Sequence, residues 1–366
     1  MFKRTIQAVL FVLAVGAMIV PLACQNVSSA GGGAKPVAYN LYFGDLHSHT
    51  SYSDGWEGTP WDAFKAAKDG GADYFAVTDH VTLWNAYSGL TLDSEEWADT
   101  LAAADYYTSE DFVAMAGYEA WLLARLGEIN VYNVRELPPL EPLGYKWDRL
   151  PDLYDWLVSN GAIGQYNHPY YMTKDFENYD YYTAARDSAM NILEVWNAQL
   201  AEDSYVMALD AGWHVMPSVN SDTHNPDWIS GYEMRTVLLA PSLTPENLYA
   251  AMNACRGYGT LDKNLRVQYM LNGAAMGSVL MPSSSYKVSI QVSDPDGAVD
   301  AIKLVEIVSD GGVVVASKKF NSADISWSTS LTSSSASYYY VRVTTDSGLD
   351  GLPGLTAWTA PVWTGS

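Results

Sequence analysis

The chain of 366 residues is longer than one ordinary domain and fits a large catalytic domain followed by a small one. Its hydrophobic content of 48% allows a large core, which excludes an intrinsically disordered protein. The formal net charge of −22 disfavours DNA, RNA and anionic membranes as partners and is compatible with the binding of divalent cations.

The first thirty residues are typical of an export signal. Lys3 and Arg4 are followed by an apolar stretch over residues 8–20 and then by small residues. The apolar stretch is short for a membrane span. Pro21-Leu22-Ala23-Cys24 resembles a lipoprotein cleavage box, so cleavage before a lipidated Cys24 and cleavage near Ala30 both remain open. We therefore expect an exported protein, either a periplasmic or outer-membrane lipoprotein or a secreted one, with a signal peptide over residues 1–30.

Beyond a small-residue linker over residues 31–40, strand-like and helix-like runs alternate up to about residue 264. The patterns predict strands over 41–46, 74–77, 112–118, 129–134, 162–166, 192–196 and 215–219. They predict helices over 60–68, 94–107 and 150–159, and a last helix that begins at Thr244-Pro245-Glu246. This alternation favours parallel strands covered by outer helices, arranged as a barrel or as a doubly wound open sheet.

The pattern of residues changes over 265–366. Helix signals vanish, and strands are predicted over 286–292, 301–308, 313–318 and 338–344. Asp294-Pro295-Asp296-Gly297 and Asp310-Gly311-Gly312 are typical turns between strands. We predict a small all-β sandwich that serves as a structural appendage to the first domain, which spans residues 41–264.

Five of the six histidines occur in short motifs at the ends of predicted strands. The motifs with their acidic neighbours are Asp45-Leu46-His47-Ser48-His49 with Ser53-Asp54-Gly55, Thr78-Asp79-His80, Gly117-Tyr118-Glu119, Asn167-His168-Pro169 and Asn220-Ser221-Asp222-Thr223-His224. Residues two apart on a strand face the same side. In a β/α barrel the carboxyl ends of the strands open onto one mouth, so ligands far apart in sequence converge there. The motif positions therefore favour the barrel over the open sheet.

Imidazole and carboxylate groups together suit zinc, manganese or iron. The chain has only two cysteines, Cys24 and Cys255, which argues against copper(I) and iron–sulfur chemistry. A lone buried histidine is usually a hydrogen-bonded core residue, and we interpret His214 in that way. The concentration of the other histidines at strand ends instead predicts a centre of two or three divalent metal ions.

In combination, Asp-Leu-His-Ser-His-Thr with Ser-Asp-Gly, Thr-Asp-His, Asn-His-Pro and Ser-Asp-Thr-His resemble the motifs of the PHP (polymerase and histidinol phosphatase) superfamily. The ending Trp358-Thr359-Ala360-Pro361-Val362-Trp363 is similar to that of its exported CehA/McbA-like metallohydrolase branch. The resemblance covers residue 41 to the C-terminus. It implies a distorted seven-stranded (β/α) barrel, up to three metals, and a phosphoesterase activity that uses zinc, manganese or iron.

The resemblance also implies three ligand groups, the first two of which share the bridging carboxylate of Glu119. The groups are His47, His49, Glu119 and Asp222 for the first metal, Glu119 and His168 for the second, and Asp54, His80 and His224 for the third. Glu119 and His168 are thereby also candidate catalytic residues. Asp79 is a third candidate, as a partner that orients a ligand histidine; the alternative is an aspartate that only forms a turn.

One position departs from the family pattern. Related sequences of the branch often have Gly-His-x-Asn where this chain has Gly127-Glu128-Ile129-Asn130, and that histidine binds the second metal. We expect Glu128 to remain a ligand through oxygen, which would favour manganese or iron over zinc at this position. The alternatives are that Glu128 turns away and leaves a weak second metal, or that it is an ordinary surface residue.

Together these observations predict a metal-dependent hydrolase, and most specifically a phosphoesterase that uses a metal-bound hydroxide on a small anionic phosphate ester. Tyr170 and Tyr171 are candidates for lining the mouth of the site. One alternative is hydrolysis of a carbamate, ester or amide bond at the same metals. The other is a non-catalytic protein that binds metal or glycan through the β domain.

Overall fold

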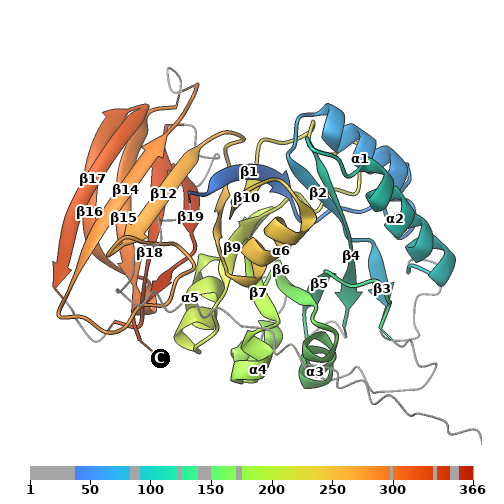
Figure 1. Cartoon of the computed structure of the whole chain (residues 1–366), viewed down its shortest axis with the longest axis horizontal. Coiled ribbons are helices and arrows are strands. Elements are labelled where there is room, and N and C mark those ends of the chain that lie inside the picture. Colours follow the sequence, from blue (N-terminus) through green and yellow to red (C-terminus); the bar gives the residue numbers. More distant parts are fainter. Residues whose placement is uncertain are drawn as a thin grey trace, which may run out of the picture.

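The computed structural model describes residues 38–82, 91–122, 126–138, 150–169, 175–296, 300–332, 336–346 and 354–365. The expected signal peptide, most of the linker, Tyr170 and Tyr171 lie outside this part of the chain. The protein is an α/β structure in which a mixed sheet with outer helices is followed by antiparallel strands (Figure 1). Among the described helices, none is long and apolar enough to cross a membrane.

Seven strands form the wall of a barrel around the site. They are β1 (Asn40–Asp45), β2 (Tyr74–Val77), β4 (Val113–Trp121), β5 (Glu128–Tyr132), β6 (Ile163–Asn167), β7 (Met190–Asn197) and β9 (Met216–Val219). Each pairs with the next in this order. A parallel bridge between Ser48 and Thr223, just past the ends of β1 and β9, joins the last strand to the first. The ring is therefore closed at its carboxyl end.

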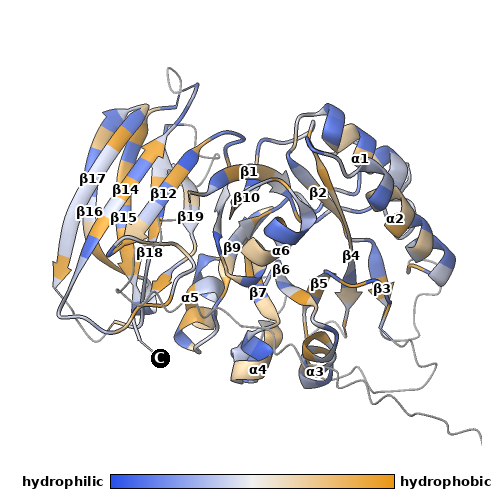
Figure 2. Ribbon diagram, viewed as in Figure 1, coloured by the Kyte–Doolittle hydropathy of each residue, from blue (hydrophilic) through white to orange (hydrophobic). Residues whose placement is uncertain are grey.

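Helices lie outside the strands (Figure 1). They are α1 (Pro60–Asp69), α2 (Ser94–Tyr107), α3 (Leu150–Asn160), α4 (Ala184–Asp187), α5 (Glu202–Asp210) and α6 (Pro245–Asn253), with a short turn η1 (Asp175–Tyr179). Pro60 is the first residue of α1 and has no N–H group that would need a partner. The Asp93 side chain at the N-cap of α2 accepts hydrogen bonds from the free N–H groups at the start of that helix. Figure 2 shows hydrophobic residues on the barrel strands and hydrophilic residues recurring along α1 and α2.

The prediction of uniformly parallel strands is wrong at β5. This strand runs antiparallel to both β4 and β6. The connection between β4 and β5 covers only residues 122–127, whereas a parallel crossover needs a dozen or more residues. Its direction matters for the site, because the first residue of an antiparallel strand lies at the end where its parallel neighbours finish.

The remaining strands extend the sheet away from the barrel. Short strands β3 (His80–Thr82) and β8 (Gln199–Leu200) pair with β4 and β7. On the other side, β10 (Arg235–Ala240) pairs antiparallel with β1, and β11 (Gly257–Thr260) follows it. The next partner of β11 is β19 (Leu355–Thr359), so the sheet continues without a break into the C-terminal strands.

The C-terminal strands form two antiparallel layers, visible side by side in Figure 1. One layer continues the barrel sheet through β18 (Tyr338–Thr345), β15 (Ile302–Ser309) and β16 (Val313–Ser322), with β20 (Val362–Trp363) at β18 and the turn η2 (Asp310–Gly312) before β16. The other contains β13 (Ala274–Ala275), β12 (Arg266–Leu271), β14 (Ser285–Ser293) and β17 (Asp324–Thr332). The predicted domain boundary at residues 264 and 265 falls between β11 and β12 and stays a prediction.

Candidate metal centre

The histidine motifs meet at the carboxyl end of the barrel strands. His47 and His49 follow β1, Asp79 and His80 follow β2, and the other motifs lie at the ends of β4, β6 and β9. The structure thus brings together nine side chains that were proposed as metal ligands: His47, His49, Asp54, His80, Glu119, Glu128, His168, Asp222 and His224. They form three groups whose ligand atoms lie within 4.8 Å of one another.

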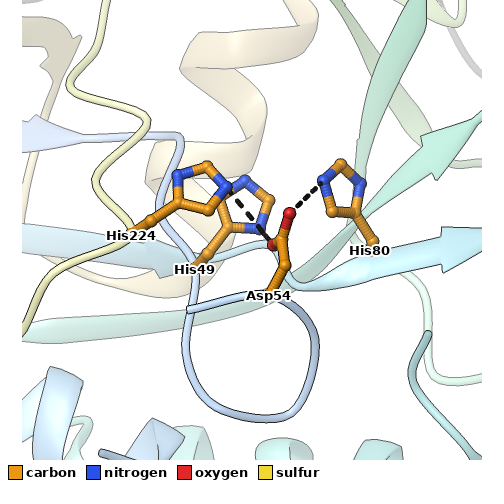
Figure 3. A group of neighbouring side chains, drawn as sticks. All are labelled: His49, Asp54, His80 and His224. Carbon is orange, nitrogen blue, oxygen red and sulfur yellow. Dashed lines mark ion pairs between the residues drawn. The ribbon is translucent and has the colours of Figure 1, made fainter. Parts of the chain in front are cut away.

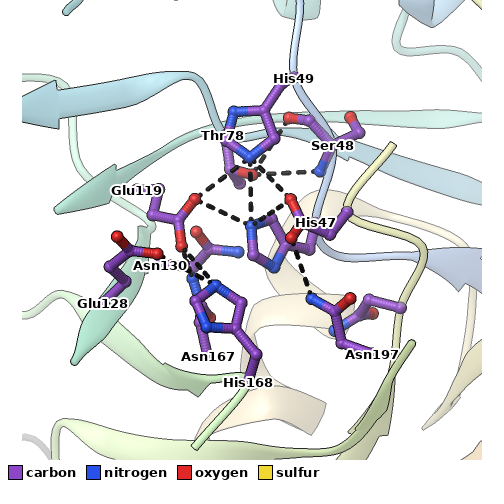
Figure 4. Close-up of polar contacts among 12 residues, drawn as sticks. His47, Ser48, His49, Thr78, Glu119, Glu128, Asn130, Asn167, His168 and Asn197 are labelled. Atoms are coloured by element: carbon purple, nitrogen blue, oxygen red, sulfur yellow. Dashed lines mark hydrogen bonds and ion pairs between the residues drawn. The ribbon is translucent and has the colours of Figure 1, made fainter. Parts of the chain in front are cut away.

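The first group is a cage of four atoms (Figure 4). The Nε2 atom of His47 lies 3.0 Å from Glu119 Oε2 and 3.3 Å from Asp222 Oδ1. The Nε2 atom of His49 lies 3.1 Å and 3.0 Å from the same two oxygens. The two Nε2 atoms are themselves 3.3 Å apart.

These separations also fit four ligand atoms around one metal ion. A tetrahedral site with ligand bonds of roughly 2.0–2.1 Å has ligand atoms about 3.3 Å apart. Asp222 Oδ1 is buried and has no hydrogen-bond partner within the described residues, although two imidazole nitrogens face it. A cation at the centre of this cage would satisfy that oxygen and remove the need for protons between the four atoms.

Glu119 joins the first group to the second. Its Oε2 atom belongs to the cage above, whereas its Oε1 atom lies 3.3 Å from His168 Nε2. That nitrogen is also 3.1 Å from Glu128 Oε2. Glu128 is the first residue of β5 and reaches the mouth because β5 runs antiparallel to its neighbours. Its side chain faces the site instead of turning away, and its role as a ligand stays a prediction.

The third group gathers around the carboxylate of Asp54, with His49 next to it (Figure 3). His224 Nε2 is 3.2 Å from Asp54 Oδ1, and His80 Nε2 is 3.5 Å from Asp54 Oδ2. His49 stands next to this group through its Nδ1 atom, 3.6 Å from Asp54. Because the His49 Nε2 atom is already directed into the first cage, a third metal would rest on Asp54, His80 and His224.

Burial and the opposed charges set the protonation of these groups when no cation is bound. Burial lowers the pKa of His49, but its close contacts with the carboxylates of Asp222 and Glu119 outweigh burial and raise the pKa to about 10. Burial raises the pKa of Asp54, whereas His224, His80 and His49 lower it to about 2. Incoming cations must therefore displace imidazole protons, and their affinity should fall as the pH is lowered.

Two of the candidate ligands have strained backbones. His168 and Asp222 have φ angles of 29° and 51°, in the left-handed region that residues with a Cβ atom rarely adopt. Such conformations cost on the order of 1–3 kcal/mol and are typical of functional sites. Backbone hydrogen bonds from His168 N–H to Glu194 (2.7 Å) and from Asp222 N–H to the His47 carbonyl (3.0 Å) hold both in place.

Glu194 is a site residue that the sequence analysis missed. Its fully buried carboxylate accepts from His47 Nδ1 at 2.9 Å and thereby directs the Nε2 atom of His47 into the first cage. Asn167 similarly donates to Glu119 Oε1 at 2.6 Å, and Asn197 donates to Asp222 Oδ2 at 3.1 Å. The sequence did offer one signal for Glu194, which is a charged residue within the apolar run of β7.

Among the residues that the structure describes, Asp79 makes no hydrogen bond to a ligand histidine, in contrast to our expectation. Its carboxylate accepts hydrogen bonds from the Thr50 N–H (2.7 Å), the Thr50 hydroxyl (2.6 Å) and the Ser53 hydroxyl (2.7 Å). Asp79 therefore fixes the loop that carries Asp54 instead of orienting an imidazole. His214 lies elsewhere and pairs with Asp187 at 2.8 Å.

A cavity of about 280 Å³ opens over the three groups. Its lining includes candidate ligands, among them His80, Glu128 and His168. It also includes the apolar side chains of Trp121, Leu122, Pro169 and Phe176. The cavity has the size of a small ligand and presents both polar and apolar groups.

No protein-family model matches the chain, and no curated protein matches it with significant similarity. Among solved structures, it is similar to a two-domain protein from Bacteroides vulgatus that contains a predicted PHP-like metal-dependent phosphoesterase. The sequences are 16% identical, the TM-score is 0.50, and the match covers 88% of this chain and 96% of the other. The two proteins therefore share a fold over nearly their whole lengths.

Proposed function

We propose that this protein is a metal-dependent hydrolase and, more specifically, a phosphoesterase of the PHP superfamily. The observation that carries the proposal is the cage of His47, His49, Glu119 and Asp222, whose ligand atoms are spaced as a tetrahedral metal site requires. The two neighbouring groups share its pocket, which favours several adjacent cations. The shared fold with a PHP-like protein supports the superfamily, and the ending over residues 358–363 supports the CehA/McbA-like branch.

Bound divalent cations would make water acidic enough to supply a nucleophile near neutral pH and would neutralise charge on phosphate oxygens. The protein's own groups hold and orient them. Glu119 presents one oxygen to each of two groups, and Asn167 fixes its orientation. Glu194 holds His47, and the Asp79 hydrogen bonds hold the loop that carries Asp54. Zinc, manganese and iron all fit these nitrogen and oxygen donors.

The proposed substrate is a small anionic molecule, a phosphate ester. No lysine or arginine side chain lines the described part of the cavity, so cations are the groups available there to bind a phosphate. The apolar lining residues Trp121, Leu122 and Phe176 suit an apolar or aromatic leaving group. Nucleic acids are poor candidates, because the chain carries a net charge of −22.

The test is metal removal combined with a panel of reporter substrates. Treatment with EDTA should abolish hydrolysis, and manganese, zinc or iron should restore it. Phosphomonoester, phosphodiester and carboxyl-ester reporters with the same aromatic leaving group should be compared, and we expect turnover of a phosphate ester. Full activity after complete metal removal would contradict the mechanism. Turnover of the carboxyl ester alone, or metal binding without turnover, would favour the alternatives of ester hydrolysis or of a binding protein.

A further inference from the structure

A second cluster of oxygen donors lies well apart in sequence from the histidine motifs. Asp262 is in the loop between β11 and β12, Asp294 and Asp296 follow β14, and Asp300 precedes β15. Each offers a carboxylate oxygen, and these oxygens all lie within 4.8 Å of one another. The cluster thus joins the segment that leaves the barrel sheet to the turn between two strands of the C-terminal layers.

Buried oxygens without partners make this cluster unusual. Asp294 is only 4% exposed, and its Oδ2 atom has no hydrogen-bond partner in the described structure. Asp300 Oδ1 and the side-chain oxygen of Asn264, a residue that contacts Asp296, also lack a hydrogen-bond partner in the described structure, although both residues are only partly buried. Leaving a buried charged oxygen unpaired costs several kilocalories per mole in order of magnitude. The unpaired carboxylate oxygens of Asp294 and Asp300, two members of the cluster, indicate a ligand that they share.

The charge balance leads to the same conclusion. Four carboxylates gather here, and the nearby Lys263 is exposed and paired with Glu233 at 2.9 Å. The pKa of Asp294 is raised to about 7, mainly by burial and secondly by the contact with Asp296. Like charges that repel one another at close range are stabilised by a cation between them.

We propose that Asp262, Asp294, Asp296 and Asp300 bind a calcium ion. The donors are hard oxygens with no imidazole or thiol among them, which suits Ca²⁺ and not the transition metals proposed for the histidine centre. The ion holds the loop after β11 against the turn after β14, and so joins the barrel side of the sheet to the C-terminal strands. The site is independent of the hydrolase proposal, because it shares no residue with the metal centre.

Calcium binding is tested on the full-length protein after removal of all metals. Wild-type protein should bind Ca²⁺ at up to millimolar concentration, and its Tm should rise by roughly 3–6 °C at saturation. Asp294→Asn should bind one Ca²⁺ fewer by calorimetric titration and lose the rise in Tm. In calcium-free buffer this variant should be at least as stable as the wild type, because the substitution removes repulsion. Asp324→Asn, at an exposed aspartate on β17, should retain the wild-type response.

An unchanged Ca²⁺ stoichiometry and an unchanged rise in Tm in Asp294→Asn would overturn the proposal. An equal rise in Tm with Mg²⁺ at the same concentration would overturn the assignment to calcium. Both readouts are independent of hydrolytic activity, so a failure here is distinguishable from a failure of the proposed function.

Discussion

At the scale of single residues, Glu119 occupies the centre of the site. Its two oxygens face different ligand groups, 3.0 Å from His47 Nε2 and 3.3 Å from His168 Nε2. The residue is almost fully buried, and burial alone would raise its pKa, yet His47 and His80 hold that pKa well below its ordinary value. Glu119 is therefore ionised, which is the state that the proposed bridge between two cations requires.

Replacing Glu119 should therefore lower the amount of bound metal more than replacing a residue that faces a single group. We expect Glu119→Ala to lose more bound metal than His80→Ala, measured by elemental analysis of protein purified without chelators. Glu119→Gln keeps the shape and removes the charge, so its kcat should fall by at least about 100-fold. Small and equal metal losses in the two alanine variants would show that Glu119 is not a bridge.

Glu128 tests how a carboxylate acts where related sequences have a histidine. Its Oε2 atom is 3.1 Å from His168 Nε2, close enough for both to bind one ion. Glu128→Ala should lose one metal equivalent, and Glu128→His should keep it while raising the affinity for zinc relative to manganese, because imidazole is the softer donor. The exposed Glu110 offers a matched control, and Glu110→Ala should change neither metal content nor activity. Full metal content and full activity in Glu128→Ala would place Glu128 outside the site.

At the scale of elements, β19 connects the two halves of the sheet. It pairs with β11 on the barrel side and with β18 on the other, and its Trp358 side chain is fully buried. Contacts between α5 and β18 add to this connection, because Arg342 and Tyr340 both bind the carboxylate of Glu202. The C-terminal strands are therefore packed into the barrel sheet and not merely tethered to it.

Trp358→Ala should lower the free energy of unfolding by about 3–5 kcal/mol, because it leaves a large cavity at this connection. Trp56 is 81% exposed, and Trp56→Ala should change that free energy by no more than about 0.5 kcal/mol. Urea unfolding followed by circular dichroism gives both values. A change in Trp358→Ala as small as in Trp56→Ala would show that β19 contributes little to stability.

At the scale of the whole molecule, we propose that the protein is exported. The support is the basic start followed by the apolar stretch over residues 8–20. Mass spectrometry of protein from the native cell envelope should find an N-terminus at Cys24 carrying a lipid mass, or an N-terminus near Ala30. Soluble cytoplasmic protein that retains Met1 would contradict this proposal.

Features that depend on nearby residues could be predicted from the sequence. The strand over 74–77 and the start of the helix at Pro60 follow from apolar runs and capping residues, and the structure confirms both. The α/β class follows from the same alternation and is confirmed. The motifs contain eight candidate ligands, and the family resemblance added Glu128; the fold brings all nine together, because residues at strand ends in a barrel meet at one mouth.

Other features depend on pairings between distant segments and were missed. The strands β12 and β17 alternate buried and exposed residues, but their serines, threonines and charged residues concealed the pattern. The strands β10 and β11 were also missed; both are buried along their whole length, and that burial comes from partners elsewhere in the sheet.

Which side chains lie next to one another within the site was decided only by the tertiary structure. The antiparallel direction of β5 places Glu128 at the mouth, and the pairing of β7 with β6 and β9 places Glu194 behind His47. It also showed that Asp79 holds a loop instead of an imidazole, and that Asp262 meets the turn at Asp294. The physical reason is that local propensity and periodicity act over a few residues, whereas distances between ligands depend on strand register and direction across the whole sheet.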